Sequence, residues 1–210
     1  MAGMMSWLLS LLRPLFAPPV CALFGALFCR SFLLRILPAI LTMIQTARLS
    51  LRPFAAADAN EAFACMTPTL TRYMAFEPPA SAAVFELIWR QWLWKIAEGS
   101  DFVFTIRTLA DGQFMGLAGL YRTAEPEPEL GIWIREDAHG QGYGGEAVAA
   151  VAHWGTQRLP VAAFIYPVAE ENHASRRIAQ ALGGTVFASE STPKYQAVIY
   201  RIPRPEPRQE

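Results

Sequence analysis

The pattern of hydrophobic and polar positions predicts regular secondary structure from residue 46 to residue 203. Residues 48–53 alternate polar and apolar side chains and stop at a proline, which is typical of a half-buried first strand. Residues 56–66 are expected to form a short helix. Ser81 is a suitable N-cap for a longer helix through about Glu98, in which apolar residues recur at close to the 3.6-residue helical period.

Beyond this second helix the pattern changes to short apolar runs with turn residues between them. Ala110, Asp111 and Gly112 separate two such runs and indicate a hairpin. The expected elements are, in chain order, strands at 102–109, 113–121 and 129–134, a helix at 146–157, a strand at 161–168, a helix at 172–182 and a strand at 195–202. An antiparallel run followed by alternating strands and helices predicts an α/β fold with a mixed sheet.

Composition and charge narrow the classes of function. The chain has 210 residues with eighteen basic and eighteen acidic side chains, so its formal net charge is zero and nucleic-acid binding through a general positive field is disfavoured. Cys21, Cys29 and Cys65 form no CxxC pair, and no histidine pair stands at ligand spacing. This argues against a disulfide framework and a structural metal site, so we expect no metal and a reducing, cytoplasmic location.

Residues 1–45 differ from the rest of the chain. They contain three arginines, no acidic residue and apolar side chains at most other positions. Their uncharged stretches, residues 14–29 and 36–47, are shorter than the roughly 20 residues that cross a bilayer, and prolines interrupt the first. We interpret residues 1–45 as an apolar extension not native to the fold, residues 46–203 as the working domain and residues 204–210 as a disordered tail.

Three interpretations of this extension stay open on the sequence alone. It is an upstream stretch included by a wrong start, with Met43 as the true start, or an appendage that binds a membrane surface or a partner, or a targeting segment. The first is favoured, so membrane contact through residues 1–45 is not our leading expectation.

Four glycines lie between the predicted strand at 129–134 and the next helix, at positions 140, 142, 144 and 145. Without Cβ atoms the backbone amides can turn inward around an anion, and the helix dipole adds to the attraction. A phosphate or a pyrophosphate is therefore the expected guest. No Gly-Lys-Ser/Thr follows, as a nucleotide phosphate loop requires, and the loop comes after an antiparallel half, unlike that of a dinucleotide fold.

Three segments in this order resemble one protein family. Residues 129–134 (ELGIWI), 139–147 (HGQGYGGEA) and 172–183 (NHASRRIAQALG) are similar to the central strand, acetyl-CoA loop and following helix of the GNAT superfamily of N-acetyltransferases. Residues 46–53 (TARLSLRP) and 71–73 (TRY) are similar to the branch with the Rim-type ribosomal-protein alanine acetyltransferases. The resemblance covers nearly all of the predicted domain and implies a mixed, mostly antiparallel twisted sheet with flanking helices.

The resemblance also implies acetyl-CoA as the co-substrate. The amides of the glycine loop would hold its pyrophosphate, and the predicted strand at 129–134 would pair with the pantetheine arm where two strands splay apart. Asn172 would form a hydrogen bond with the pantetheine. The residues implied in acetyl-CoA binding are Ile132, Trp133, Ile134, His139, Gly140, Gln141, Gly142, Tyr143, Gly144, Gly145 and Asn172.

Two positions depart from the family pattern. His139 stands where the family usually has Arg or Gln, which weakens one expected phosphate contact. Ala179 occupies the position where many members have the tyrosine that protonates the leaving thiolate. Ser175, one helical turn before Ala179, is the substitute acid that the Rim-like branch suggests.

The remaining groups follow from the chemistry of acetyl transfer to an amine. The amine must lose a proton, and the carbonyl oxygen must be stabilised as charge develops on it. Glu129, at the head of the strand that lines the cleft, is the candidate base, directly or through water, with Glu77 and Glu86 as alternatives. The resemblance suggests the backbone amide of Trp133 or Ile134 as the oxyanion donor.

We therefore predict a GNAT-like domain that transfers an acetyl group from acetyl-CoA to a primary amine. The acceptor is a protein N-terminal amine or a small molecule, and the protein is a monomer or a homodimer with no nucleic-acid partner. Three alternatives remain: a different acyl-CoA, a non-catalytic acyl-CoA-binding module, which the alanine at position 179 allows, and a membrane-associated adaptor that acts through residues 1–45.

Overall fold

The structure is a computed structural model that describes residues 43–206. The predictions for residues 1–42 and for residues 207–210 lie outside this range. Ile44 and Gln45 form a short strand that pairs with the first predicted strand, so the sheet includes the last two residues assigned to the extension. The boundary at residue 46 otherwise stays a prediction. Within the described range, no helix is long and apolar enough to cross a membrane.

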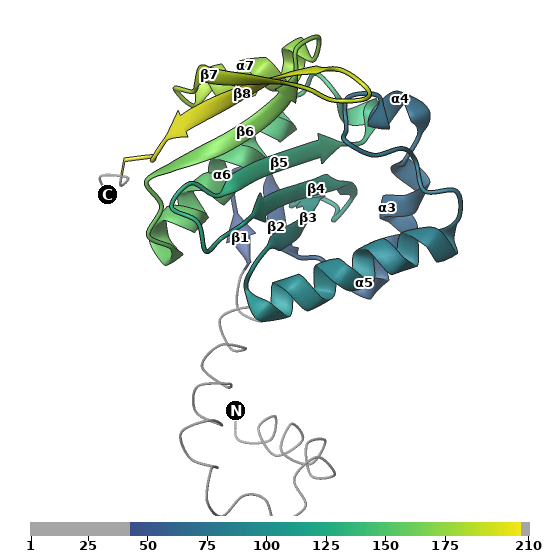
Figure 1. The fold of residues 1–210 in the computed structure, drawn as a ribbon. Coiled ribbons are helices and arrows are strands. Elements are labelled where there is room, and N and C mark those ends of the chain that lie inside the picture. The colour runs from purple at the N-terminus through teal and green to yellow at the C-terminus, as the bar shows by residue number, and fades with distance from the viewer. Residues whose placement is uncertain (1–42, 207–210) are drawn as a thin grey trace, which may run out of the picture. The chain divides into compact units, whose positions relative to one another are not determined.

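The described strands form one mixed sheet (Figure 1). Its order is β1-β2-β3-β4-β5-β6-β8-β7, in which only β5 and β6 run parallel and every other neighbouring pair is antiparallel. This confirms the predicted mixed, mostly antiparallel α/β fold. The strands are β1 (Ile44–Gln45), β2 (Leu49–Pro53), β3 (Phe102–Thr108), β4 (Phe114–Tyr121), β5 (Glu129–Ile134), β6 (Ala163–Ala169), β7 (Thr185–Ser191) and β8 (Gln196–Pro203).

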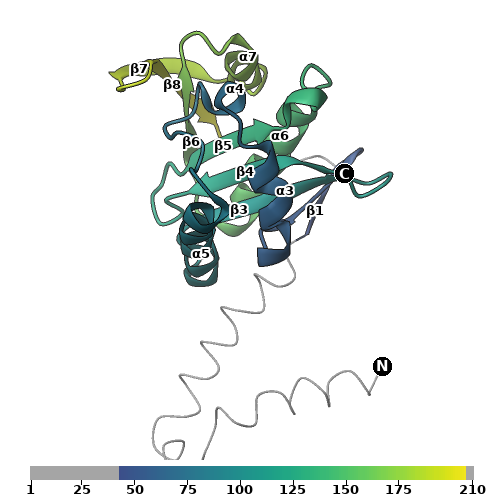
Figure 2. The ribbon, with the colours of Figure 1, turned by 90° about the vertical axis from the view of Figure 1, so that its right-hand side faces the viewer.

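Helices cover both faces of the sheet (Figures 1 and 2). One hydrophobic core lies between the sheet and helices α6 and α7, and a second lies between the sheet and helices α3 and α5. The helical elements are η2 (Ala56–Asp58), α3 (Ala59–Cys65), α4 (Pro68–Thr71), α5 (Ala82–Glu98), η3 (Glu136–Ala138), α6 (Tyr143–Arg158) and α7 (His173–Ala181).

Strand β5 contributes to both cores because successive side chains of a strand point to opposite faces. Leu130 and Ile134 are buried in the α6 and α7 core, and Ile132 packs against that core. Trp133 packs against the α3 and α5 core. By the same alternation, Glu129 points to the face that α3 and α5 cover.

Most predicted elements are confirmed, with three differences. Helix α6 begins at Tyr143, not at residue 146, because Gly144 and Gly145 adopt helical geometry in its first turn despite the low helix propensity of glycine. Strand β7 was not predicted, because its residues are mostly exposed and form a strand only by pairing with β8. Helix α4 was also missed, since it is a single turn capped by the Thr67 hydroxyl.

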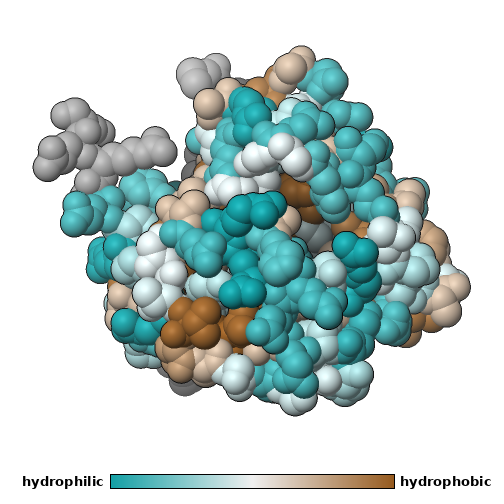
Figure 3. Space-filling view, turned by 90° about the horizontal axis from the view of Figure 1, so that it is seen from above, coloured by the Kyte–Doolittle hydropathy of each residue, from teal (hydrophilic) through white to brown (hydrophobic). Residues whose placement is uncertain are grey.

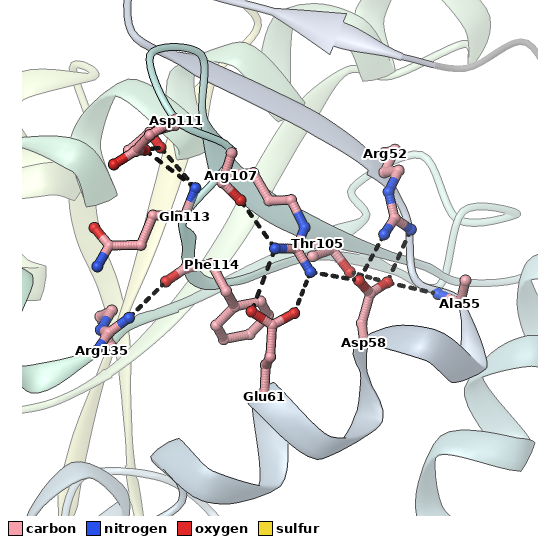
Figure 4. Close-up of polar contacts among 12 residues, drawn as sticks. Arg52, Ala55, Asp58, Glu61, Thr105, Arg107, Asp111, Gln113, Phe114 and Arg135 are labelled. Atoms are coloured by element: carbon pink, nitrogen blue, oxygen red, sulfur yellow. Dashed lines mark hydrogen bonds and ion pairs between the residues drawn. The ribbon is translucent and has the colours of Figure 1, made fainter.

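A buried carboxylate ties strands β2 and β3 to the start of α3 (Figure 4). Asp58 is fully buried and accepts two hydrogen bonds from Arg52, at 2.6 and 2.8 Å. It also accepts hydrogen bonds from Arg107 at 3.0 Å, the Thr105 hydroxyl at 2.9 Å and the Ala55 amide at 3.0 Å. These donors come from β2, β3 and the turn before α3, so the Asp58 side chain fixes how α3 begins on the sheet.

The hydrogen bonds also keep this carboxylate ionised. Burial raises the pKa of Asp58, but hydrogen bonds from the Ala55 amide, Arg107, Arg52 and Thr105 outweigh burial and hold the pKa below its usual range. A folded-state pKa below the unfolded value contributes stability above the unfolded pKa, and this contribution is lost as the pH falls through the folded pKa.

Replacing Asp58 with Asn should therefore lower the free energy of unfolding at neutral pH by about 3 kcal/mol, because two arginines lose their buried partner. The difference from the native protein should shrink as the pH falls below about 4, where Asp58 of the unfolded chain becomes protonated, and it should be lost as the pH falls through the lower pKa of the folded state. Urea unfolding at several pH values measures both effects. Asp137→Asn is the matched control at an exposed ion pair and should change stability little. An equal loss in the two variants would contradict the assignment.

Candidate functional site

The parallel strands β5 and β6 are joined at one end and diverge at the other. Glu129 and Ile165 form the single residue pair between them. Before this pair the chains stay in contact, since the Ala162 amide donates to the Pro126 carbonyl at 2.8 Å and the Ile165 amide donates to the Pro128 carbonyl at 3.0 Å. Beyond it, β5 pairs only with β4, and β6 pairs only with β8. We call the region beyond this pair the β5–β6 opening.

Backbone amides of β5 point into this opening. The Arg135 amide donates to the Met115 carbonyl of the β4 side at 2.8 Å. In an antiparallel ladder the hydrogen-bonding groups of successive residues alternate in direction, so the amide of Trp133 also points to β4. The amides of Ile132 and Ile134 then point away from β4, toward the opening. Of the two oxyanion donors considered from the sequence, this favours Ile134.

His139 lies at the end of the same strand. Its Nε2 is 2.7 Å from the Ile134 carbonyl oxygen, so the ring donates to the last carbonyl on the opening side of β5. The imidazole therefore fixes the start of the glycine loop to the strand. Its predicted role as a phosphate contact stays a prediction.

The glycine loop leads from η3 into α6. Gly140 and Gly142 have φ angles of 78° and 81°, in the left-handed region that glycine adopts without strain. Gly142 is the N-cap of α6 and supplies no capping side chain, so the first amides of the helix have no acceptor from the cap. A bound anion can satisfy these amides, which agrees with the predicted role of the loop.

An arginine from the bend between β1 and β2 holds this loop in place. Arg48 Nη1 donates to the Gln141 carbonyl at 3.0 Å, and its guanidinium also pairs with Glu146 at 2.6 Å. The Thr46 hydroxyl donates to the same carboxylate at 2.5 Å. Because the carbonyl and the following amide of a trans peptide point in opposite directions, the contact with Gln141 directs the Gly142 amide away from Arg48.

Asn172 and Ser175 lie at the start of α7, the helix that follows β6. The Asn172 side chain is the N-cap of α7 and accepts a hydrogen bond from the Ser175 amide at 3.1 Å. Ser175 Oγ lies 2.8 Å from the hydroxyl of Tyr166, a buried residue of β6. Loop and helix also touch, because a Cβ at Gly144 would lie 3.2 Å from Ile178 of α7.

Glu129 lies at the end of the opening where β5 and β6 pair. Its side chain is on the face of the sheet that α3 and α5 cover, opposite to the face covered by α7. Its Oε2 accepts a hydrogen bond from Arg122 Nη2 at 2.8 Å, and 29% of its side chain is exposed. Burial raises the pKa of Glu129, the Arg122 guanidinium opposes this shift, and the charges of Asp101 and Glu125 add to it. A carboxylate with a raised pKa is a stronger base than one in water, as an amine-deprotonating group requires.

The arginine beside Glu129 has an unusual backbone. Arg122 has a φ of 57°, which costs a non-glycine residue about 1 kcal/mol or more. Its amide donates to Asp101 Oδ1 at 2.9 Å, and Asp101 in turn pairs with Lys95 at 2.6 Å. Strained backbone of this kind is common at functional sites, where surrounding contacts hold it. Here the backbone conformation of Arg122 brings its guanidinium into contact with Glu129.

Tyr121 lies next to Glu129, on the neighbouring strand β4. The two residues are direct cross-strand neighbours. The Tyr121 ring folds over two glycines, since a Cβ at Gly119 would overlap the ring and one at Gly131 would lie 3.0 Å from it. Burial raises the pKa of Tyr121, and the nearby charges of Glu129 and Asp101 raise it further.

The alternative bases lie in ion pairs at the periphery. Glu86 pairs with Arg90 on the exposed side of α5. Glu77 pairs with Lys194 at 2.9 Å, and the same ammonium donates to the carbonyls of Thr71 and Phe76. Lys194 therefore ties the chain between α4 and α5 to the turn between β7 and β8.

From above, the surface is mostly hydrophilic, and apolar residues are visible in a recess near its centre (Figure 3).

The described residues contain no group of histidine, cysteine, aspartate and glutamate side chains that could hold a metal ion.

Four residues of this site were missed in the sequence. They are Arg48, Tyr121, Arg122 and Tyr166. For Tyr121, the glycines at 119 and 131 inside strands were an available signal, because such glycines often mark a close approach. The sequence carried no signal for the other three, whose partners become neighbours only through sheet pairing and helix packing.

Comparison with known proteins gives a family match. A family model described as an acetyltransferase (GNAT) domain matches residues 48–185. No curated protein matches the chain. The matched residues include the glycine loop, Asn172 and Ser175.

Several solved structures share the fold. RimL, a ribosomal L7/L12 alpha-N-protein acetyltransferase solved with coenzyme A, has a TM-score of 0.68 at 15% identity, covering 76% of this chain and 97% of that chain. Spermidine N-acetyltransferase from Vibrio cholerae, solved with CoA and spermine, has a TM-score of 0.66 at 16% identity, with the same coverage of 76% and 97%. An acetyltransferase from Agrobacterium tumefaciens str. C58 has a TM-score of 0.64 at 25% identity, covering 77% and 94%.

Replacing Arg122 with Gln should raise the pKa of Glu129, because the substitution removes the positive charge that opposes the effect of burial. Glu129 would then stay protonated to a higher pH than in the native protein. NMR titration of the carboxyl group measures the shift. Arg201→Gln is the matched control, since it removes an arginine from the neighbouring pair with Glu127. An unchanged pKa in Arg122→Gln would show that the ion pair is not formed in solution.

Proposed function

Because the chain belongs to the GNAT acetyltransferase family, we propose that it transfers an acetyl group from acetyl-CoA to a primary amine. The match of the GNAT family model to residues 48–185 supports the reaction class. One structural observation carries the assignment to this site: the β5–β6 opening lies between the glycine loop at one end and the carboxylate of Glu129 at the other.

The residues present fit acetyl-CoA. The first-turn amides of α6, with Gly140 and Gly142 in the left-handed conformation, suit a pyrophosphate. The backbone groups of Ile132, which point into the opening, suit an amide of a pantetheine arm. The residues proposed to contact acetyl-CoA remain Ile132, Trp133, Ile134, His139, Gly140, Gln141, Gly142, Tyr143, Gly144, Gly145 and Asn172.

Acetyl-CoA supplies the acetyl group as an activated thioester, and the protein supplies positions and protons. Glu129 accepts a proton from the amine, directly or through a water molecule. A backbone amide of β5 that points into the opening stabilises the developing charge on the carbonyl oxygen. Ser175, on the α7 side, donates a hydrogen bond to the departing sulfur. Base and donor thus act from opposite faces of the sheet.

The acceptor is a protein N-terminal amine or a small-molecule amine. Among the structures with this fold, RimL acts on a ribosomal protein, and the Vibrio cholerae protein is a spermidine acetyltransferase. Both acceptor classes therefore belong in the first screen. We propose a cytoplasmic location, and either a monomer or a homodimer.

A screen of acceptors tests this function. The protein is mixed with acetyl-CoA and with peptides bearing free N-termini, polyamines or simple amines, and released CoA is measured with a thiol reagent. Amine-dependent release of CoA supports the proposal. Binding of acetyl-CoA without release for any amine would contradict it and would favour a non-catalytic acyl-CoA-binding module.

Replacing Gly142 with Val should weaken acetyl-CoA binding by about tenfold or more, or about 1.4 kcal/mol, because a β-branched residue is strained at φ 81° and distorts the anion-binding turn. Calorimetric titration measures the affinity. Gly112→Val is the matched control, because Gly112 has a φ of 72° in the turn between β3 and β4, outside the glycine loop. Equal acetyl-CoA affinity in the two folded variants would remove the pyrophosphate assignment.

Replacing Glu129 with Gln should reduce the turnover number by about a hundredfold at pH 7, with little change in acetyl-CoA affinity, because the base is lost and the shape is kept. The defect should become smaller at higher pH as the amine loses its proton unaided. A pH profile of turnover measures both effects. Glu127→Gln, two residues earlier, is the control. Full activity of Glu129→Gln across the range would exclude Glu129 as the base.

A further inference from the structure

A buried tyrosine of β6 faces helix α7 close to the position where the expected tyrosine is missing. Ala179 is completely buried in α7 and offers no polar group. Tyr166 is 2% exposed, and its hydroxyl lies 2.8 Å from Ser175 Oγ, one helical turn before Ala179. A phenol therefore reaches the candidate donor from the strand and not from the helix.

The strand position of Tyr166 places it beside the opening. It follows Ile165, the last residue of β6 that pairs with β5. Its ring belongs to the core between the sheet and helices α6 and α7. Tyr166 thus reaches Ser175 from the core side of α7.

The direction of the hydrogen bond follows from the partners available. Ser175 Oγ has one proton, and this proton can be given to only one acceptor. Tyr166 Oη has no other hydrogen-bond partner among the described residues. Burial raises the pKa of Tyr166 to about 12, so the phenol keeps its proton at every pH at which the protein works. A permanently protonated phenol that donates to Ser175 leaves the serine proton free.

We propose that Tyr166 is a positioning residue for acetyl transfer: it donates its phenolic proton to Ser175 Oγ and so directs the Ser175 hydroxyl toward the sulfur of CoA. The proposal rests on the proposed function, and it adds a residue that neither the family match nor the sequence pattern assigns. A donor that itself accepts a hydrogen bond is also a stronger donor, because hydrogen bonds in a chain polarise one another.

The chemical step needs no proton from either hydroxyl. When the bond between the acetyl carbon and sulfur breaks, its electron pair stays on sulfur, and the acetyl carbon keeps its new bond to the amine nitrogen. Ser175 stabilises the thiolate by donating a hydrogen bond, since an aliphatic hydroxyl is a far weaker acid than a thiol. The proton that the amine released to Glu129 or to water neutralises the thiolate after it has left.

The structure offers a matched control for the alternative that Tyr166 only fastens α7 to the sheet. Tyr200 of β8 is the cross-strand neighbour of Tyr166 and is also buried. Its hydroxyl accepts a hydrogen bond from Arg176 Nε at 3.1 Å, so it too ties the sheet to α7. Tyr166→Phe and Tyr200→Phe each remove one such bond, and only the first removes the contact with Ser175.

The deciding measurement is the pKa of the CoA thiol bound to the full chain, followed by NMR of isotope-labelled CoA. In the native protein we expect this pKa to lie below that of free CoA by about one unit, because Ser175 favours the thiolate. In Tyr166→Phe the thiol pKa should rise by about half of this difference, and in Ser175→Ala it should rise to the value of free CoA. In Tyr200→Phe it should equal the native value. Thermal unfolding of the variants confirms that each is folded.

Turnover supplies a second measurement. Tyr166→Phe should lower kcat about tenfold with little change in the KM for acetyl-CoA, and Tyr166→Phe combined with Ser175→Ala should equal Ser175→Ala alone. The proposal would be overturned if Tyr166→Phe kept the native thiol pKa. It would also be overturned if Tyr200→Phe raised this pKa as much as Tyr166→Phe does.

The proposed function and the role of Tyr166 fail in different ways. CoA binding without turnover for any amine overturns the acetyltransferase function, while the thiol titration still decides whether Tyr166 acts through Ser175. Absence of CoA binding overturns both.

Discussion

Parallel strands β5 and β6 share only the pair between Glu129 and Ile165, and the candidate site depends on this interruption of the sheet. A sheet whose strands stayed paired would use all of its backbone groups internally. The divergence instead leaves the amides of Ile132 and Ile134 without a strand partner. The His139 ring donates a hydrogen bond to the carbonyl of Ile134, the last residue of β5. Backbone groups without partners must be satisfied by something else, and an extended ligand with its own amides can do so.

The opening requires support from elements outside it. On one face, the contact between Gly144 and Ile178 joins the glycine loop to α7, and Arg48 holds the loop from the bend between β1 and β2. On the other face, the buried carboxylate of Asp58 holds the start of α3 on β2 and β3. The loop and the helices can therefore keep their positions where strand pairing no longer fixes them.

The two faces of the sheet carry different chemistry. The α3 and α5 face presents Glu129, whose charge is balanced by Arg122, and the α6 and α7 face presents Ser175, backed by Tyr166. Acetyl transfer to an amine is helped by a proton acceptor near the attacking nitrogen and by a hydrogen-bond donor near the departing sulfur. A site that passes between two strands can draw on both faces, which explains why its residues come from elements distant in the chain.

The sequence by itself determined most of the elements, the mixed sheet, the glycine loop and the family, because strand alternation, helical period and closely spaced glycines are local properties that a single stretch of chain encodes. Tertiary structure alone decided that Arg48 holds the Gln141 carbonyl, that Arg122 faces Glu129 and that Tyr166 lies against Ser175. These contacts depend on strand register and on how α7 packs against β6. Nothing in the local pattern specifies either, because many alternative pairings of the same strands satisfy the same alternation.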